Sequence, residues 1–265
     1  MADAAGGVKQ TTLDITGAKI EVNEIGSGRP VLFLHGGQGP APQHPFFAKL
    51  AAGGHRVVMP THPGFGGSSL PDWLDSCDDI AHIHLEMMDK LGLARPALIG
   101  ASIGGWIAAE MATKAPERFS HLALIGPVGI KVGPVDKLDI PDIFALPPDR
   151  LQALLWHAPE TFRTDPASMN DAQLLAAVRA RETMALLAWE PYMHNPKLLH
   201  RLHRCTMPAL VLRGESDGLV SAKYAAAYSR LLPNARFETI AAAGHVPQIE
   251  QTDATAKTIL GFIAG

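Results

Sequence analysis

Pro96-Ala97-Leu98-Ile99-Gly100-Ala101-Ser102-Ile103-Gly104 is the stretch that decides the fold. A short apolar run leads into a G-x-S-x-G element, and a pattern typical of a helix follows from Trp106 to Lys114. A serine at a corner between strand and helix projects its hydroxyl from a tight turn, around which the two glycines allow close packing. A helix that begins just after Ser102 also points unpaired N–H groups at any oxyanion formed there. The context predicts a nucleophilic serine.

Short continuous apolar runs recur at residues 31–34, 57–59, 97–99, 122–125 and 209–212. Such runs suit strands buried on both faces, as in a parallel sheet covered by helices. Helical patterns separate several of them, for example the apolar stripe between Asp79 and Leu91. Near the start, residues 11–16 and 19–25 alternate weakly around a glycine, as a hairpin does. This order predicts the fold class α/β, with an open, mostly parallel sheet flanked by helices.

One stretch, residues 127–205, shows helical patterns and no clear buried strand. The patterns cover residues 149–156, 171–189 and 196–204. We therefore predict a core formed by residues 1–126 and 206–265, with residues 127–205 inserted as a helical cap. The apolar cap residues predicted to line a pocket are Trp156, Met184, Trp189 and Tyr192. The alternative for any one of them is that it only packs the cap onto the core.

The composition is that of a globular enzyme-sized chain, with 265 residues, 47% hydrophobic and 18% charged. A formal net charge of −3 gives no electrostatic case for binding nucleic acid or an anionic membrane. The N-terminus lacks the apolar core of a signal peptide, and no apolar run is long enough to cross a bilayer. The two cysteines, Cys77 and Cys205, form no disulfide framework and lack metal-ligand spacing. We expect a cytoplasmic protein, and the sequence leaves a homodimer open.

A serine nucleophile needs a base and an acid that orients the base. The candidate base is His245, in a loop between the predicted strand 236–240 and a final helix. The candidate acid is Asp217, just past the end of the strand at residues 209–212, where catalytic groups gather in such sheets. The order Ser102, Asp217, His245 is the one expected for a G-x-S-x-G architecture. Glu215 is the rival acid.

The oxyanion donors are backbone amides. Ile103, directly after the nucleophile, supplies one N–H group. The second is expected from the glycine-rich turn after the strand at residues 31–34, where we choose Gly37, with Gly36 or Gln38 as alternatives. Gln38 and Val246, which adjoin the turn and the candidate base, complete the predicted pocket.

The chain resembles enzymes of the α/β-hydrolase fold over essentially its whole length. The matching segments are LHGG at 34–37, PTHPGFGGS at 60–68, GASIGGW at 100–106, LRGESDGLV at 212–220 and AGHVPQIE at 243–250. The resemblance implies hydrolysis through an acyl-enzyme without metal or organic cofactor, and a helical cap between the sixth and seventh core strands. A serine at position 102 argues against the branches that carry aspartate there, the haloalkane dehalogenases and epoxide hydrolases.

The branch within this superfamily decides the substrate. The turn HGGQGP is similar to the HGxGPG turn of hydrolases that cleave carbon–carbon bonds in ring-fission products, with one residue inserted. Those enzymes usually carry a tryptophan directly after the catalytic histidine, where this chain has Val246. We therefore expect an ester or lactone hydrolase for small, mostly apolar substrates. The alternatives are a carbon–carbon bond hydrolase of vinylogous diketones and a ligand-binding sensor on the same fold.

Overall fold

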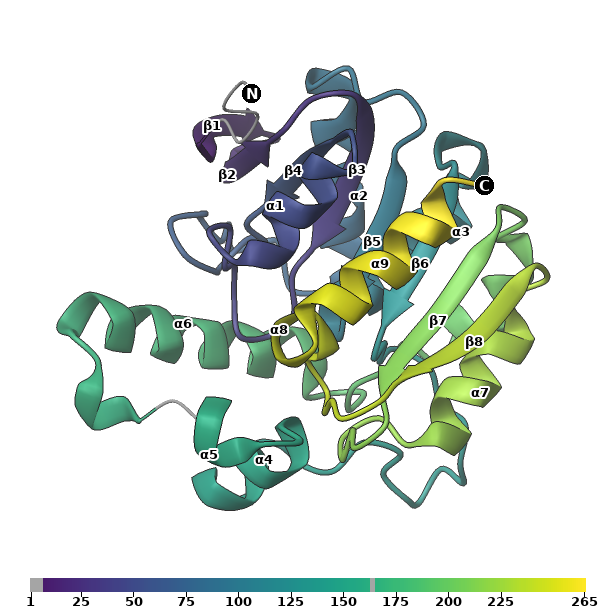
Figure 1. The fold of residues 1–265 in the computed structure, drawn as a ribbon. Coiled ribbons are helices and arrows are strands. Elements are labelled where there is room, and N and C mark those ends of the chain that lie inside the picture. The colour runs from purple at the N-terminus through teal and green to yellow at the C-terminus, as the bar shows by residue number, and fades with distance from the viewer. Residues whose placement is uncertain (1–6, 163–164) are drawn as a thin grey trace.

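The structure is a computed structural model that describes residues 7–162 and 165–265. The first six residues of the predicted core and residues 163–164 of the predicted cap lie outside this described part. Within it, eight strands form one sheet in the order β1-β2-β4-β3-β5-β6-β7-β8 (Figure 1). Their bounds are β1 Lys9–Ile15, β2 Ala18–Ile25, β3 Arg29–Leu34, β4 His55–Pro60, β5 Ala97–Ala101, β6 His121–Ile125, β7 Ala209–Gly214 and β8 Ala235–Ile240. The predicted hairpin and buried strands are all present.

The sheet is parallel from β4 through β8. Strands β1 and β2 form an antiparallel hairpin, and β2 pairs antiparallel to β4. Leu34 at the end of β3 pairs with Gly100 in β5, and Ala101 pairs with Ile125 at the end of β6. The carboxyl ends of these strands therefore meet at one edge of the sheet, where ligands bind in open α/β folds.

Helices cover both faces of the sheet. Alternate residues of β3 divide between two apolar clusters, because successive side chains of a strand point to opposite faces. Val31 and Phe33 pack with α1 (Pro45–Ala52) and α9 (Thr252–Ile263). Leu32 and Leu34 pack on the other face with α2 (Cys77–Lys90), α3 (Ile103–Lys114) and α7 (Ala222–Leu231). Figure 1 shows α1 and α9 side by side over one face. A short helix, α8 (Pro247–Glu250), precedes α9.

The segment between β6 and β7 contains the other helices: α4 (Pro148–Leu155), α5 (Pro159–Phe162) and α6 (Asp171–Ala188), with 3₁₀ turns η2 (Pro166–Ser168), η3 (Leu198–His200) and η4 (Leu202–Arg204). Helix α6 begins at a capping box, in which Asn170 and Gln173 each bond the other's backbone N–H. The helix predicted at 196–204 is wrong. The amides of Arg201 and Cys205 bond carbonyls three residues back, which closes two tight turns instead of a helix.

Helix α6 lies against the loops that follow β3 and β4, at the sheet edge described above (Figure 1). The Thr183 hydroxyl donates to the carbonyl oxygen of Gly64 at 3.0 Å, and the Arg179 guanidinium donates to that of Gly66 at 2.9 Å. The extent of the cap as a separate unit stays a prediction. Among the described residues, no helix has the length and apolar character that a membrane span requires.

Candidate active site

Ser102 occupies the turn between β5 and α3 with φ 54° and ψ −119°, a conformation that L-residues rarely adopt. Its two flanking glycines are required by close backbone contacts. A Cβ at Gly100 would overlap the carbonyl oxygen of Gly104, and a Cβ at Gly104 would overlap that of Leu34. The G-x-S-x-G pattern therefore reflects tight packing between strand and helix, which aims the serine hydroxyl away from the backbone.

The structure brings the three predicted triad residues together. Nε2 of His245 lies 2.9 Å from the Ser102 hydroxyl oxygen, and Nδ1 of His245 lies 2.9 Å from Oδ2 of Asp217. His245 and Asp217 are both buried. Because an ionised carboxylate only accepts, Nδ1 of His245 carries the ring proton and Nε2 is free to accept the serine proton. This arrangement is that of a nucleophile with its base.

Backbone amides hold the Asp217 carboxylate in place. Its second oxygen, Oδ1, accepts from the N–H groups of Leu219 and Val220 at 2.9 and 2.8 Å. The rival acid, Glu215, is exposed and, among the described residues, accepts one 3.3 Å bond, from the amide of Ala242. The geometry therefore favours Asp217 over Glu215 as the partner of the histidine.

The candidate oxyanion turn lies directly beside the serine. A Cβ at Gly36 would meet the Cβ of Ser102 at 3.4 Å. The amides of Gly37 and Ile103 have no acceptor within the described residues. An oxyanion donor needs such a free N–H group. The amides of Gly36 and Gln38 are equally unpaired there, so the choice of Gly37 within the turn stays a prediction.

Three of the predicted pocket residues lie beside the triad. Met184 of α6 packs on the turn, since its sulfur would lie 2.7 Å from a Cβ at Gly37. Val246, next to the histidine, belongs to a small apolar cluster with Trp156. The carbonyl oxygen of Leu155 accepts from the amide of His245 at 2.7 Å, so the end of α4 also positions the histidine loop.

The other three have different surroundings. Trp189 is 54% exposed and packs on Phe144 at 5.5 Å between ring centroids, and its place in the pocket lining stays a prediction. The Tyr192 hydroxyl donates to the carbonyl oxygen of Pro141 and accepts from the amide of Ile143, which commits it to holding a loop. Burial raises the pKa of Tyr192 to about 12. Gln38 is exposed.

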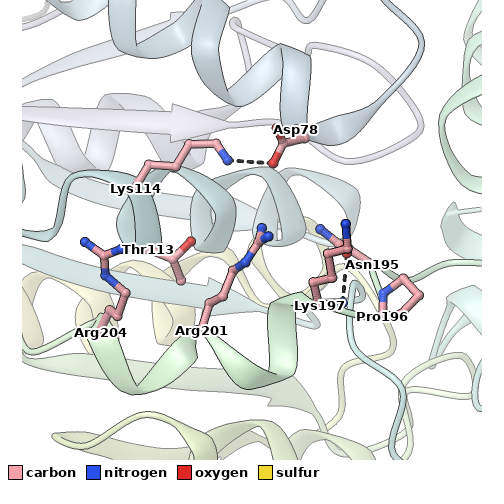
Figure 2. Close-up of a pocket in the computed structure, with 8 residues that line it drawn as sticks. All are labelled: Asp78, Thr113, Lys114, Asn195, Pro196, Lys197, Arg201 and Arg204. Carbon is pink, nitrogen blue, oxygen red and sulfur yellow. Dashed lines mark hydrogen bonds and ion pairs between the residues drawn. The ribbon is translucent and has the colours of Figure 1, made fainter.

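A cavity of about 700 Å³ lies elsewhere, between α2, the end of α3 and the turns η3 and η4 (Figure 2). Its lining is basic, and Lys114 is paired there with Asp78. The lining residues are Asp78, Thr113, Lys114, Asn195, Pro196, Lys197, Arg201 and Arg204. None of them belongs to the triad, so this cavity is not the place where Ser102 acts.

Sequence reasoning missed a group of buried histidines next to the oxyanion turn. His35, His62 and His84 have ring centroids 3.9 and 5.0 Å apart in succession. Burial lowers the pKa of His35 to about 4 and that of His84 to about 3, and it holds the pKa of His62 well below its usual value. The signal was a histidine in PTHPGFGGS together with one on the buried stripe of α2, 22 residues later.

A model of the alpha/beta hydrolase fold matches residues 29–252 of the chain. The chain therefore belongs to the α/β-hydrolase-fold family. It is 28% identical to a 2-hydroxy-6-oxononadienedioate/2-hydroxy-6-oxononatrienedioate hydrolase of Paraburkholderia phymatum, over 94% of this chain and 92% of that protein. It is 26% identical to a 2-hydroxymuconate semialdehyde hydrolase of Pseudomonas putida, with 94% and 92% of the two chains covered.

Solved structures agree on the fold. The 2-hydroxy-6-oxo-6-phenylhexa-2,4-dienoate hydrolase of a Rhodococcus strain superimposes with a TM-score of 0.76 at 22% identity, over 98% of this chain and 99% of that chain. An esterase of Thermogutta terrifontis gives 0.74 at 22%, over 97% and 98%. The predicted α/β-hydrolase fold is confirmed, and the family match and the sequence relatives named above support hydrolase activity.

Proposed function

We propose that this chain is a serine hydrolase that cleaves a carbon–carbon bond next to a ketone, in a substrate of the 2-hydroxy-6-oxo-dienoate class. One observation carries the substrate class. Relatives that align over more than nine-tenths of both chains are named as hydrolases of 2-hydroxy-6-oxo-dienoates or of 2-hydroxymuconate semialdehyde, at 26–28% identity. This was the alternative to our first expectation of an ester or lactone, and the comparisons favour the alternative.

The site supplies the groups that the reaction needs. The Ser102 oxygen attacks the ketone carbonyl as His245 removes the hydroxyl proton, and Asp217 stabilises the imidazolium. The carbonyl oxygen becomes an oxyanion held by the amides of Gly37 and Ile103. Collapse of this intermediate breaks the carbon–carbon bond, and the carbon leaving group takes the proton from the imidazolium. Water, activated by the histidine, then hydrolyses the acyl-serine.

The leaving group limits which substrates can react. A simple carbanion is far too basic to leave, so the departing carbon must be conjugated to a second carbonyl that accepts its charge as an enolate. A vinylogous diketone meets this condition once its dienol has tautomerised, in which carbon gains a proton and the hydroxyl oxygen loses one. The triad alone does not impose it, because an ester would lose its alkoxide through the same acyl-enzyme.

Ester or lactone hydrolysis is the second candidate, and Val246 is the observation that favours it. The resemblance to carbon–carbon hydrolases calls for tryptophan at this position, and the chain also has one extra residue in HGGQGP. Val246 packs in the apolar cluster of Trp156 and Leu219, which gives the histidine loop an apolar lining. Such a lining suits a small apolar acyl or alkyl group.

A substrate panel separates the two. We would compare kcat/KM for a 2-hydroxy-6-oxo-dienoate, p-nitrophenyl esters of graded chain length and simple lactones, with Ser102→Ala as the blank. The proposal expects the dienoate to exceed the best ester by about 10-fold or more, equivalent to about 1.4 kcal/mol in transition-state binding. The opposite ranking supports an esterase. Absence of turnover on every substrate, with a correctly folded protein, supports a binding role.

A further inference from the structure

A hydrogen-bonded chain of buried histidines leads from α2 to the oxyanion turn. Nδ1 of His62 lies 2.8 Å from Nε2 of His84, and Nε2 of His62 lies 3.0 Å from the carbonyl oxygen of His35. The backbone N–H of His62 donates to Nε2 of His35 at 3.0 Å. Nδ1 of His35 lies 2.8 Å from the carbonyl oxygen of Gly36. These contacts leave no room for an ion between the rings of His62 and His84.

The partners determine where each ring carries its proton. A carbonyl oxygen only accepts, so Nε2 of His62 must be the N–H, and its Nδ1 then accepts from Nε2–H of His84. Nε2 of His35 accepts from an amide, so its Nδ1 is the N–H that donates to Gly36. All three rings are neutral in this arrangement. Burial, which disfavours charged imidazole, acts in the same direction.

The chain ends on the peptide group that carries the candidate oxyanion donor. The Gly36 carbonyl oxygen accepts from His35 and also from the amide of Gly39 at 3.0 Å. Because the peptide is planar and trans, the N–H of Gly37 points opposite to the Gly36 carbonyl. Rotation of this peptide would break both bonds. The direction of the Gly37 N–H is therefore set by His35 together with the Gly39 amide. His62 contacts His35 at its carbonyl oxygen and at its ring.

Packing alone explains these polar residues poorly. His62 and His84 are fully buried, and Nδ1 of His84 has no hydrogen-bond partner within the described residues. An unpaired buried acceptor costs free energy that an apolar side chain of similar size would avoid. A core selected only for packing would place leucine or methionine there. The buried histidines therefore lower the stability of the fold, and a role at the oxyanion turn would explain why they are present.

We propose that His62, oriented by His84, is a positioning residue that aims the Gly37 N–H at the oxyanion formed on the substrate of Ser102. This inference rests on the proposed function of Ser102 as the nucleophile. His62 does not touch the substrate. Its effect falls on stabilisation of the transition state, because an oxyanion donor must point at the place where charge develops and contributes less to ground-state binding.

Replacement of His62 tests the proposal on the best substrate of the panel. Loss of a whole oxyanion donor lowers kcat by about 10²–10³-fold, so a misaimed one in His62→Leu should lower kcat by about 10–100-fold with KM nearly unchanged. His62→Gln keeps a donor and an acceptor and should recover most of the loss. His84→Leu, which removes only the donor to His62, should give a smaller loss of kcat.

A matched control is available at the start of β4, the strand that precedes the His62 loop. His55 is also buried, and its Nδ1 lies 3.3 Å from the carbonyl oxygen of Arg29, at the opposite end of β4. His55→Leu removes a comparable buried contact far from the triad and should leave kcat within about twofold. The proposal is overturned if folded His62→Leu keeps the kcat of the parent, or if it raises KM alone. Should His62→Leu not fold, the same criteria apply to His84→Leu, which removes the donor to His62.

Nuclear magnetic resonance gives a readout that does not depend on turnover. Histidine ring ¹⁵N shifts should show Nε2–H on His62 and His84 and Nδ1–H on His35. The Gly37 amide signal should shift in His62→Leu and stay in place in His55→Leu. If no substrate is hydrolysed, the proposed function fails while these signals still test the positioning chain. If substrates are hydrolysed but the Gly37 signal is insensitive to His62, the positioning claim fails alone.

Discussion

Ser102 is held in an uncommon backbone conformation by its neighbours. Its amide donates to the carbonyl oxygen of Ile125 at 2.9 Å, and its own carbonyl oxygen accepts from the amides of Gly105 and Trp106. A residue in a sparsely populated region of φ and ψ costs about 1–3 kcal/mol and persists only when the surrounding structure imposes it. The strained backbone of Ser102 therefore costs stability, and in return it presents the serine hydroxyl to His245.

The carboxylate assignment is also tested at this scale. Asp217→Asn keeps the size of the side chain but removes the charge that fixes the His245 tautomer, and it should lower kcat by about 10³–10⁴-fold. Glu215→Gln is the matched control, because Glu215 is exposed and makes one long bond. It should change kcat by less than about threefold. The reverse ranking in steady-state kinetics would show that Glu215 is the acid.

Helix α6 packs on the loops that form the site. The two residues at its C-terminal end that were predicted to line the pocket differ in burial. Met184 packs on Gly37, whereas Trp189 at the end of the helix is half exposed. Met184→Ala should shift substrate preference toward longer acyl groups, since one methylene in an apolar pocket is worth about 1–3 kcal/mol. Trp189→Ala should leave the preference unchanged. The check is kcat/KM across a chain-length series, and an equal response of both variants would contradict the account.

The same helix shows where sequence patterns succeed and where they stop. The strands and the triad were predictable, because buried runs, glycine turns and strand ends mark positions along the chain. The roles of Trp189 and Tyr192 were not, since an apolar residue on a helix does not say which surface it meets. The sequence marks His62 as a loop residue after β4 and His84 as a residue on the buried stripe of α2, but it does not say that this loop folds over α2 so that the two rings meet.

For the whole molecule, the buried histidines link stability to pH. Their folded pKa values are lowered, to about 4 for His35 and about 3 for His84. The unfolded chain takes up these protons below about pH 6.5, whereas the folded chain does not until about pH 4 or lower. The contribution of the buried neutral histidines to the free energy of unfolding is therefore complete above about pH 6.5. It is lost as the pH falls toward their pKa values in the folded chain. Each such group contributes a slope of about 1.4 kcal/mol per pH unit in this window.

His84→Gln should make the free energy of unfolding depend less steeply on pH between pH 6 and pH 4. The slope should fall by the contribution of about one proton, even though the variant is less stable overall. Chemical denaturation at a series of pH values measures it. His82→Gln is the control, since His82 is exposed on the same helix. An unchanged slope in His84→Gln would mean that His84 is not held neutral by the fold.

In the proposed mechanism, His245 and Asp217 activate Ser102 to form a covalent acyl-enzyme. Labelling with a fluorophosphonate, followed by mass spectrometry of the digested protein, tests it most directly, because the probe traps an activated serine whatever the natural substrate is. We predict a single adduct on Ser102 that forms rapidly in the parent chain. It should be absent from Ser102→Ala and slowed by at least about 10³-fold in His245→Ala. An adduct on another residue, or no adduct on a folded parent chain, would contradict the account.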